Sequence, residues 1–148
     1  MLQKFALILL CSLFMMNVSA GDPLFHDTQG NTIASSRLKG KWVVVNYWAA
    51  WCESCIEEIP ELNHFYQNNH DKNVVFYGGN FDQLPAADLK KAMRESKISY
   101  PVLVEDPENI WQLDAIDALP VTFIIKPDGK VAKKILGAST EQSLLAAL

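Results

Sequence analysis

The chain has 148 residues, a length that fits one domain, and 49% of them are apolar. Its formal net charge at pH 7 is −4, and it contains no long run of lysines or arginines. Neither the net charge nor any basic run therefore suggests nucleic-acid binding. The sequence also lacks repeats and low-complexity segments, so we expect one globular unit.

The first twenty residues have the pattern of a secretory signal peptide. Lys4 supplies the positive charge, residues 5–18 are apolar, and small residues end the segment at Ala20. We expect cleavage after Ala20, which leaves residues 21–148 as an exported domain with no stable membrane span. An uncleaved anchor is the alternative, but a spanning helix needs about twenty apolar residues. Without Lys4 the net charge is −5, which argues against electrostatic attachment to a membrane.

A small hairpin is predicted next, over residues 24–33, because a polar turn at Asp27-Thr28-Gln29-Gly30-Asn31 separates two short apolar ends. A second turn, residues 38–41, leads into residues 42–48. That segment is β-branched and aromatic with little alternation, which is typical of a strand buried on both faces.

Two cysteines in a Cys-x-x-Cys arrangement, Cys52 and Cys55, follow this strand directly. A helix is predicted to begin at the first of them, and its free N–H groups and partial positive charge favour a thiolate. The remaining cysteine, Cys11, leaves with the predicted signal peptide. Because a disulfide that closes so short a loop stabilises the fold little, the pair is interpreted as a redox dithiol.

The helix predicted from residue 52 to about residue 69 contains Pro60, which is expected to kink it. Helical spacing places an apolar face toward the core and two glutamates, Glu57 and Glu61, toward solvent. The residues assigned to the apolar face are Ile56, Ile59, Leu62 and Tyr66.

The second half of the chain alternates between strand and helix patterns and ends in a hairpin and a helix. Ser139 is the predicted N-cap of the last helix, with Gln142 completing a capping box. The predicted elements are a strand at 73–78, a helix at 84–96 with Leu89 and Met93 inward, a short strand at 100–104, a brief helix around Trp111, and strands at 121–125 and 131–136 joined by a turn at 126–130. This order describes an α/β fold in which a central mixed sheet is flanked by helices.

Three features together resemble the thioredoxin fold, and within it the TlpA/ResA group of exported proteins. They are Trp51-Cys52-x-x-Cys55 after a buried strand, Pro60 in the following helix, and Leu119-Pro120-Val121-Thr122-Phe123 before a hairpin. The N-terminal hairpin is similar to the extension that this group carries. The resemblance covers residues 24–148.

The resemblance assigns roles to individual residues. Cys52 is implied to be the exposed attacking thiol and Cys55 the buried resolving thiol. Pro120 is implied to be in cis beside the dithiol, where it presents the flanking backbone to an extended partner. Glu58 is implied to exchange a proton with Cys55. Asn46 stands where thioredoxin has a buried acid, and it is expected to be a hydrogen-bonded buried group.

The chain also departs from its relatives. Between the cysteines it has Glu53-Ser54, without the proline that many relatives place before the second cysteine. The charge of Glu53 disfavours a thiolate on Cys52. Because this makes the reduced form less stable, we expect a lower, more reducing reduction potential for the Cys52–Cys55 pair. The segment after Pro120 lacks the acidic residue found in dedicated cytochrome c maturation proteins, which weakens any assignment to that substrate. Trp51 is expected to pack against the protein and to shield the sulfurs.

The sequence therefore predicts a thiol:disulfide oxidoreductase that reduces disulfides of exported, periplasmic partner proteins, with a membrane reductant of the DsbD/CcdA kind as electron donor. A thiol oxidase of similar fold is an alternative, although the chain is too short for the helical insertion of DsbA-type oxidases. A Cu(I)-handling metallochaperone that uses the same two thiolates is another. No cofactor and no metal site is expected, because His64 and His70 suit solvated positions near the end of a helix.

Overall fold

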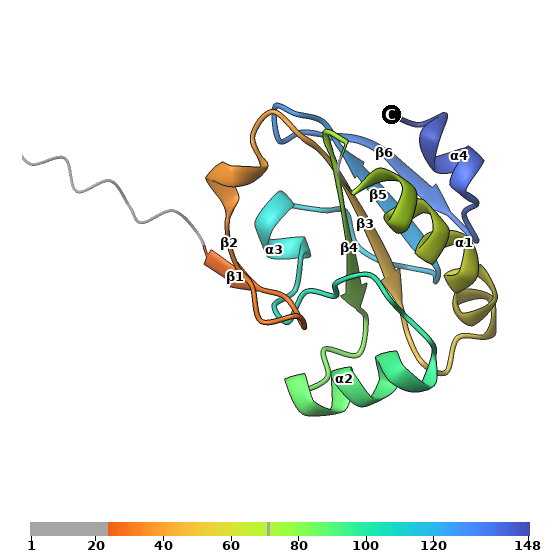
Figure 1. Ribbon diagram of the computed structural model, residues 1–148. Helices are drawn as coiled ribbons and strands as arrows, with labels where there is room; N and C mark the ends of the chain where they lie inside the picture. Colours follow the sequence, from red (N-terminus) through yellow and green to blue (C-terminus); the bar gives the residue numbers. More distant parts are fainter. Residues whose placement is uncertain (1–23, 71) are drawn as a thin grey trace, which may run out of the picture.

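The computed structural model describes residues 24–70 and 72–148. The predicted signal peptide, residues 1–20, lies outside the described residues. The centre of the fold is a four-stranded mixed sheet with layers of other elements on both faces, and a two-stranded sheet lies beside it (Figure 1). The predicted architecture, including the N-terminal hairpin, is confirmed.

The central sheet has the strand order β4-β3-β5-β6. Strand β3 (Trp42–Trp48) pairs in parallel with β4 (Val74–Asn80) and antiparallel with β5 (Val121–Ile125), and β5 pairs antiparallel with β6 (Val131–Leu136). Every residue of β3 after Trp42 is buried, as expected for a β-branched and aromatic strand covered on both faces. β4 is longer than predicted, because the pairing continues to Asn80.

Helix α1 (Glu53–Asn69) begins directly after Cys52 and covers one face of the sheet. Its inward face differs from the prediction in part. Ile59 and Leu62 are buried as expected, but Ile56 and Tyr66 lie half-buried at the edge. The other positions that α1 buries are Cys55, Glu58, Phe65 and Asn69.

Three shorter helices complete the layers: α2 (Ala86–Glu95), α3 (Glu108–Trp111) and α4 (Glu141–Leu145). Residues of α2 and α4 share the hydrophobic cluster under α1, whereas α3 packs on the opposite face with the N-terminal hairpin. No helix within residues 24–70 and 72–148 is long and apolar enough to cross a membrane.

The cap of α4 was predicted one residue too early. Thr140 is the N-cap, and its side chain and that of Ser143 form the reciprocal capping box. Ser139 is buried instead, and its backbone N–H donates to Glu58. The hydrogen bond to Glu58 therefore holds Ser139 in the core, and Thr140 takes the N-cap position in its place.

The N-terminal hairpin consists of β1 (Leu24–His26) and β2 (Thr32–Ala34), followed by the 3-10 helix η1 (Ser35–Leu38). The prediction of a regular strand at 100–104 is wrong. This segment forms only two isolated β-bridges, Val102 with Gly78 and Leu103 with Asp27. Pro101 has no N–H to donate, and the N–H of Val104 bonds to the hairpin instead, so the segment links the hairpin to β4.

Candidate active site

The two cysteines of the motif occupy the start of α1 and form a disulfide. Cys52 is the N-cap residue, with extended backbone angles, and its sulfur accepts a hydrogen bond of 3.2 Å from the N–H of Cys55. Cys52 is 7% exposed and Cys55 is fully buried. An incoming sulfur therefore has access to Cys52 only. The helix N-terminus stabilises negative charge on the same atom.

A carboxylate lies buried in the second turn of the same helix. Glu58 is 3% exposed, and it accepts hydrogen bonds of 2.7 Å from Asn46 Nδ2 and 2.7 Å from the N–H of Ser139. Burial raises the pKa of Glu58 to about 7, although the two hydrogen bonds act to lower it. This group can therefore take or release a proton near neutral pH.

Asn46 connects this carboxylate to the sheet. Its amide nitrogen also donates to Thr122 Oγ1 at 3.1 Å, and Thr122 lies 3.4 Å from the hydroxyl of Ser139. The expectation that Asn46 is hydrogen-bonded holds for this nitrogen, whereas Oδ1 has no partner among the described residues. Thr122 and Ser139 received no role from the sequence. The signal for Thr122 was available, since it is the polar position in an otherwise apolar strand.

Trp51 does not pack into the protein as predicted, because it is 66% exposed. Its indole N–H donates to the carboxylate of Asp82, at 3.0 and 3.1 Å to the two oxygens, and its ring meets Phe81 edge-to-face. Phe81 is itself 41% exposed. The residue next to Cys52 is thus an oriented aromatic surface, and sequence reasoning missed both residues that hold it.

Pro120 is buried and directly precedes β5. The Leu119–Pro120 peptide bond is cis, and the carbonyl of Pro120 accepts a hydrogen bond of 2.9 Å from Gly137. Two residues further on, Thr122 bonds to Asn46. The proline segment and the buried carboxylate therefore belong to one connected region of the sheet.

The profile of the AhpC/TSA family matches residues 15–134. This match spans most of the chain. The chain belongs to the AhpC/TSA family.

Two curated relatives carry the same description. The thiol-disulfide oxidoreductase ResA of Bacillus cereus is 32% identical over 118 residues, which are 80% of this chain and 68% of the relative. ResA of Bacillus subtilis is 31% identical over 121 residues, covering 82% and 67%. This member of the AhpC/TSA family is accordingly a thiol-disulfide oxidoreductase of the ResA type.

Solved structures share its fold. A thiol:disulfide interchange protein of the thioredoxin family from Chlorobium tepidum superimposes with a TM-score of 0.70 at 27% identity, covering 85% of this chain and 90% of that chain. StoA from Bacillus subtilis superimposes with a TM-score of 0.71 at 20% identity, covering 84% and 94%. The predicted thioredoxin fold of this AhpC/TSA family member is thereby confirmed.

Other residues considered as metal ligands lie apart. His64 bonds to Glu141 at 3.3 Å, and His70 bonds to the carbonyl of Tyr66 at 3.0 Å. Over residues 24–70 and 72–148, no three histidine, cysteine or acidic side chains gather in a way that would hold a metal ion. The groups that α1 supplies to the site are the sulfurs of Cys52 and Cys55 and the carboxylate of Glu58, one turn beyond Cys55.

Proposed function

We propose that this protein is an exported reductase of disulfides in partner proteins, and that Cys52 and Cys55 carry out the exchange. The observation that carries the proposal is the arrangement of one accessible sulfur, one buried sulfur and a buried carboxylate in consecutive turns of α1. An exchange enzyme needs a thiolate that an outside disulfide can reach and a second thiol that only the first can reach. The partial exposure of Cys52 and the full burial of Cys55 support this division of roles.

In the reduced enzyme, the Cys52 thiolate attacks one sulfur of the target disulfide, and the other target sulfur leaves as a thiolate. Cys55 then loses its proton and attacks Cys52, which breaks the mixed disulfide and releases the second target sulfur. Two electrons pass from the dithiol to the target, which gains two protons. Glu58, whose pKa lies at about 7, is suited to take the proton of Cys55 and to return it on re-reduction.

Acidic residues around the dithiol support the reducing direction. Glu53, Glu57 and Glu58 follow Cys52 within two turns, and α1 has no basic residue before His64. Negative charge disfavours the thiolate and hence the reduced form, so the dithiol gives up its electrons more readily. The name of the relatives, thiol-disulfide oxidoreductase, supports thiol–disulfide exchange and states no direction.

The predicted signal peptide and the electron supply complete the proposal. An oxidising compartment would oxidise an idle dithiol, so continued reduction requires a donor. A membrane thiol reductant of the DsbD/CcdA kind fits that need. We further propose that Pro120 presents the backbone beside it to the extended chain of either partner.

Trapping of mixed disulfides tests the exchange. A Cys55→Ser variant keeps the attacking sulfur but has no thiol to release the partner, so covalent adducts with substrates and donor should accumulate. The matched control is the Cys52→Ser/Cys55→Ser double variant, which should trap nothing. Absence of adducts from a folded Cys55→Ser protein would refute the mechanism.

The reduction potential of the Cys52–Cys55 pair tests the direction of electron flow. A strongly oxidising value would refute the proposal that the protein acts as a reductase.

A further inference from the structure

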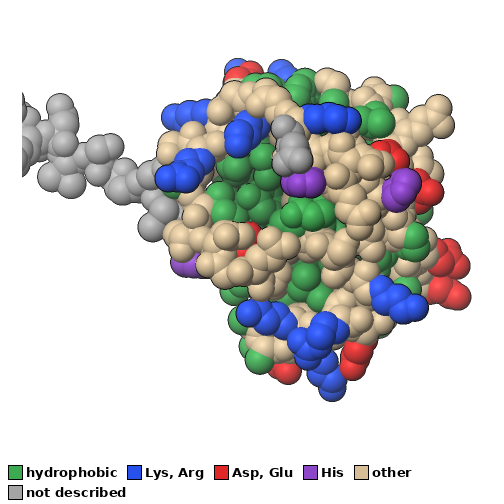
Figure 2. Space-filling view, in the orientation of Figure 1, with side chains coloured by type: hydrophobic (Ala, Val, Ile, Leu, Met, Phe, Trp, Pro, Cys, Tyr) green, Lys and Arg blue, Asp and Glu red, His purple; other side chains and the backbone are tan. Residues whose placement is uncertain are grey.

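Several cations lie together at the end of the sheet opposite the dithiol, and others lie on α2. Strand β3 begins at this end and runs toward Cys52. The turn before β3 and the β5–β6 turn meet here through a hydrogen bond of 2.9 Å from Gly40 to Pro127. Figure 2 shows Lys and Arg side chains along the top of the view, where Figure 1 places these turns. We call this region the basic end; its cations are Arg37, Lys39, Lys41, Lys126 and Lys130.

None of these cations is neutralised within the described chain. Their side chains make no hydrogen bond or ion pair with another described residue. Residues 35–41 and 126–131 contain a single carboxylate, Asp128, which accepts a hydrogen bond of 3.0 Å from the backbone of Lys130. A chain whose formal charge is −4 thus places unpaired cations on one end. Their mutual repulsion is relieved by an anionic partner.

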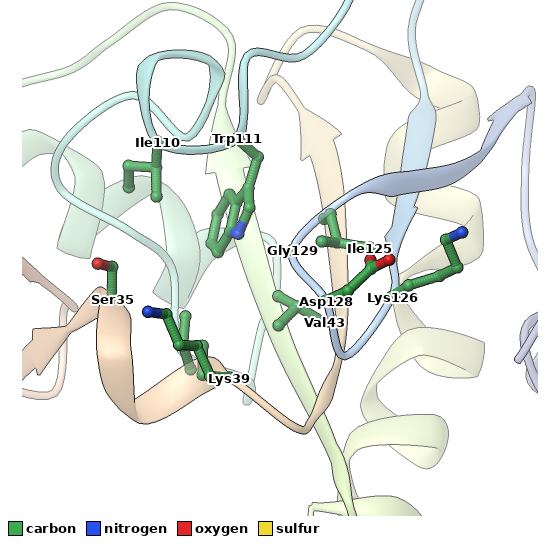
Figure 3. Close-up of a pocket in the computed structure, with 10 residues that line it drawn as sticks. Ser35, Lys39, Val43, Ile110, Trp111, Ile125, Lys126, Asp128 and Gly129 are labelled. Atoms are coloured by element: carbon green, nitrogen blue, oxygen red, sulfur yellow. The ribbon is translucent and has the colours of Figure 1, made fainter.

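A groove lined by both apolar and polar residues opens in the middle of the basic end (Figure 3). It has a volume of about 170 Å³ and lies between η1, α3 and the β5–β6 turn. Lys39, Lys126 and the carboxylate of Asp128 belong to its lining. Trp111 is half-buried in its wall. Tryptophan favours the boundary between an apolar and a polar medium. The apolar lining residues are Leu38, Val43, Ile110, Trp111 and Ile125.

The distribution of the cations indicates an extended partner. They lie on two separate turns rather than converging on one point, so a small anion would reach only some of them. The phosphate groups of a bilayer surface can contact all of them at once. Each lysine or arginine near an anionic bilayer raises the binding constant about fivefold. We propose that the basic end docks on an anionic phospholipid bilayer, with Trp111 at the level of the headgroups.

This docking leaves the active site free. The seven residues of β3 separate the basic end from the dithiol by about 20 Å, at about 3.3 Å per residue. With the basic end on the bilayer, Cys52 and Trp51 point away from it. The net charge of the chain argues against electrostatic attachment to a membrane. The structure adds the positions of the charges, and the cations of the basic end lie together on one side of the molecule.

Vesicle binding tests the proposal. The chain from Gly21 onward, which is the predicted mature form, contains every described helix and strand. In about 20 mM salt it should sediment with phosphatidylcholine vesicles that contain about 30% phosphatidylglycerol, and not with pure phosphatidylcholine; about 300 mM salt should release it. Lys39→Gln/Lys126→Gln should bind roughly 30-fold more weakly.

The matched control is Lys90→Gln/Lys91→Gln, which removes the same charge from the exposed part of α2. It should bind almost as well as the wild type. Both double variants should reduce insulin at the wild-type rate, which separates this proposal from the proposed function. Equal binding to neutral vesicles, no binding to anionic vesicles, or an equal loss in the control variant would overturn the docking proposal.

Orientation is tested with brominated lipids, which quench nearby tryptophans. Trp111→Phe should remove more of the quenching than Trp51→Phe, because Trp51 lies beside the dithiol at the other end of β3. The opposite result would show that the other end of the molecule faces the bilayer.

Discussion

Asn46 donates a hydrogen bond of 2.7 Å to Glu58, so a strand side chain and a helix carboxylate meet in the core, one turn of α1 beyond Cys55. The contact is buried on both sides, since Asn46 is fully buried and Glu58 is 3% exposed. A buried carboxylate would ordinarily be costly. The hydrogen bonds from Asn46 and Ser139 stabilise the charged carboxylate only in part, so the pKa of Glu58 stays raised at about 7.

The raised pKa of Glu58 makes the stability of the fold depend on pH. The ordinary value is 4.5, so between pH 4.5 and 7 the folded state holds a proton that the unfolded state has lost. The free energy of unfolding contributed by this group is therefore full below pH 4.5 and is lost as pH rises through 7. For the oxidised protein we expect wild type to lose roughly 2–3 kcal/mol relative to Glu58→Gln between pH 5 and pH 8. Urea unfolding measures this, and a pH-independent difference would contradict it.

Removing the donor from Asn46 should raise the pKa of Glu58 further. In Asn46→Ala, Oε1 of the carboxylate loses its partner, and a hydrogen bond to a charged group is worth about one pKa unit or more. The titration of the labelled carboxyl carbon by NMR measures the shift. Thr122→Val is the control, because it removes the other acceptor of Asn46 and leaves the donor to Glu58 in place. Equal shifts in both variants would show that the direct bond is unimportant.

The strands of the central sheet were predictable because their pattern is local. Residues 121–125 and 131–136 form strands with the predicted bounds, and residues 42–48 also match. Each has β-branched or aromatic residues between turn residues, and a clear turn at 126–130 fixes the last pair. The dithiol was predictable for the same reason, since motif, strand and helix are contiguous.

The rest depends on contacts between distant residues. Glu58 received its role only from the family resemblance, and its burial depends on hydrogen bonds from Asn46 and Ser139, which lie in other parts of the fold. The same contact removes Ser139 from its predicted capping role. Trp51 is exposed because Asp82, more than thirty residues away, holds its indole outward. None of these pairings has a signal in the local sequence.

A partly buried hydrogen bond between Tyr47 and Asp106 gives a direct stability test. Tyr47 donates to Asp106 at 2.6 Å, and burial together with this acceptor raises the pKa of the tyrosine. Tyr47→Phe should lower the free energy of unfolding by about 1–2 kcal/mol, since Asp106 keeps its other donors. Tyr77→Phe is the control, because the hydroxyl of Tyr77 has no hydrogen bond within the described chain. A similar loss in both variants would argue against a specific contribution from this bond.

Close packing at Gly78 should make that position intolerant of a side chain. A Cβ there would lie 2.8 Å from Val102 Cγ2 and 3.1 Å from the ring of Tyr100. We expect Gly78→Ala to lower the free energy of unfolding by roughly 1–3 kcal/mol. In a double-mutant cycle measured by urea unfolding, Val102→Ala should offset part of this loss, because it removes the clashing methyl group. Strict additivity would show that the clash is relieved elsewhere.

Exposure of Trp51 beside Cys52 leads to a prediction about substrate size. The indole is 66% exposed yet held by Asp82 and Phe81, so it offers a partner protein an ordered apolar surface at little entropic cost. Trp51→Ala should lower kcat/KM for insulin reduction by roughly tenfold, as expected for the loss of about 1.4 kcal/mol of contact with a bound chain. Reduction of a small aromatic disulfide should change little, because such a molecule reaches the sulfur without the platform. The free energy of unfolding should stay within about 0.5 kcal/mol of wild type, since an exposed side chain contributes little to the core.

The control variant is Asp82→Ala, which removes the hydrogen bond to the indole of Trp51 and leaves the indole itself in place. It should give an intermediate loss of kcat/KM with insulin. Equal losses with both substrates would instead place Trp51 in the chemistry at Cys52.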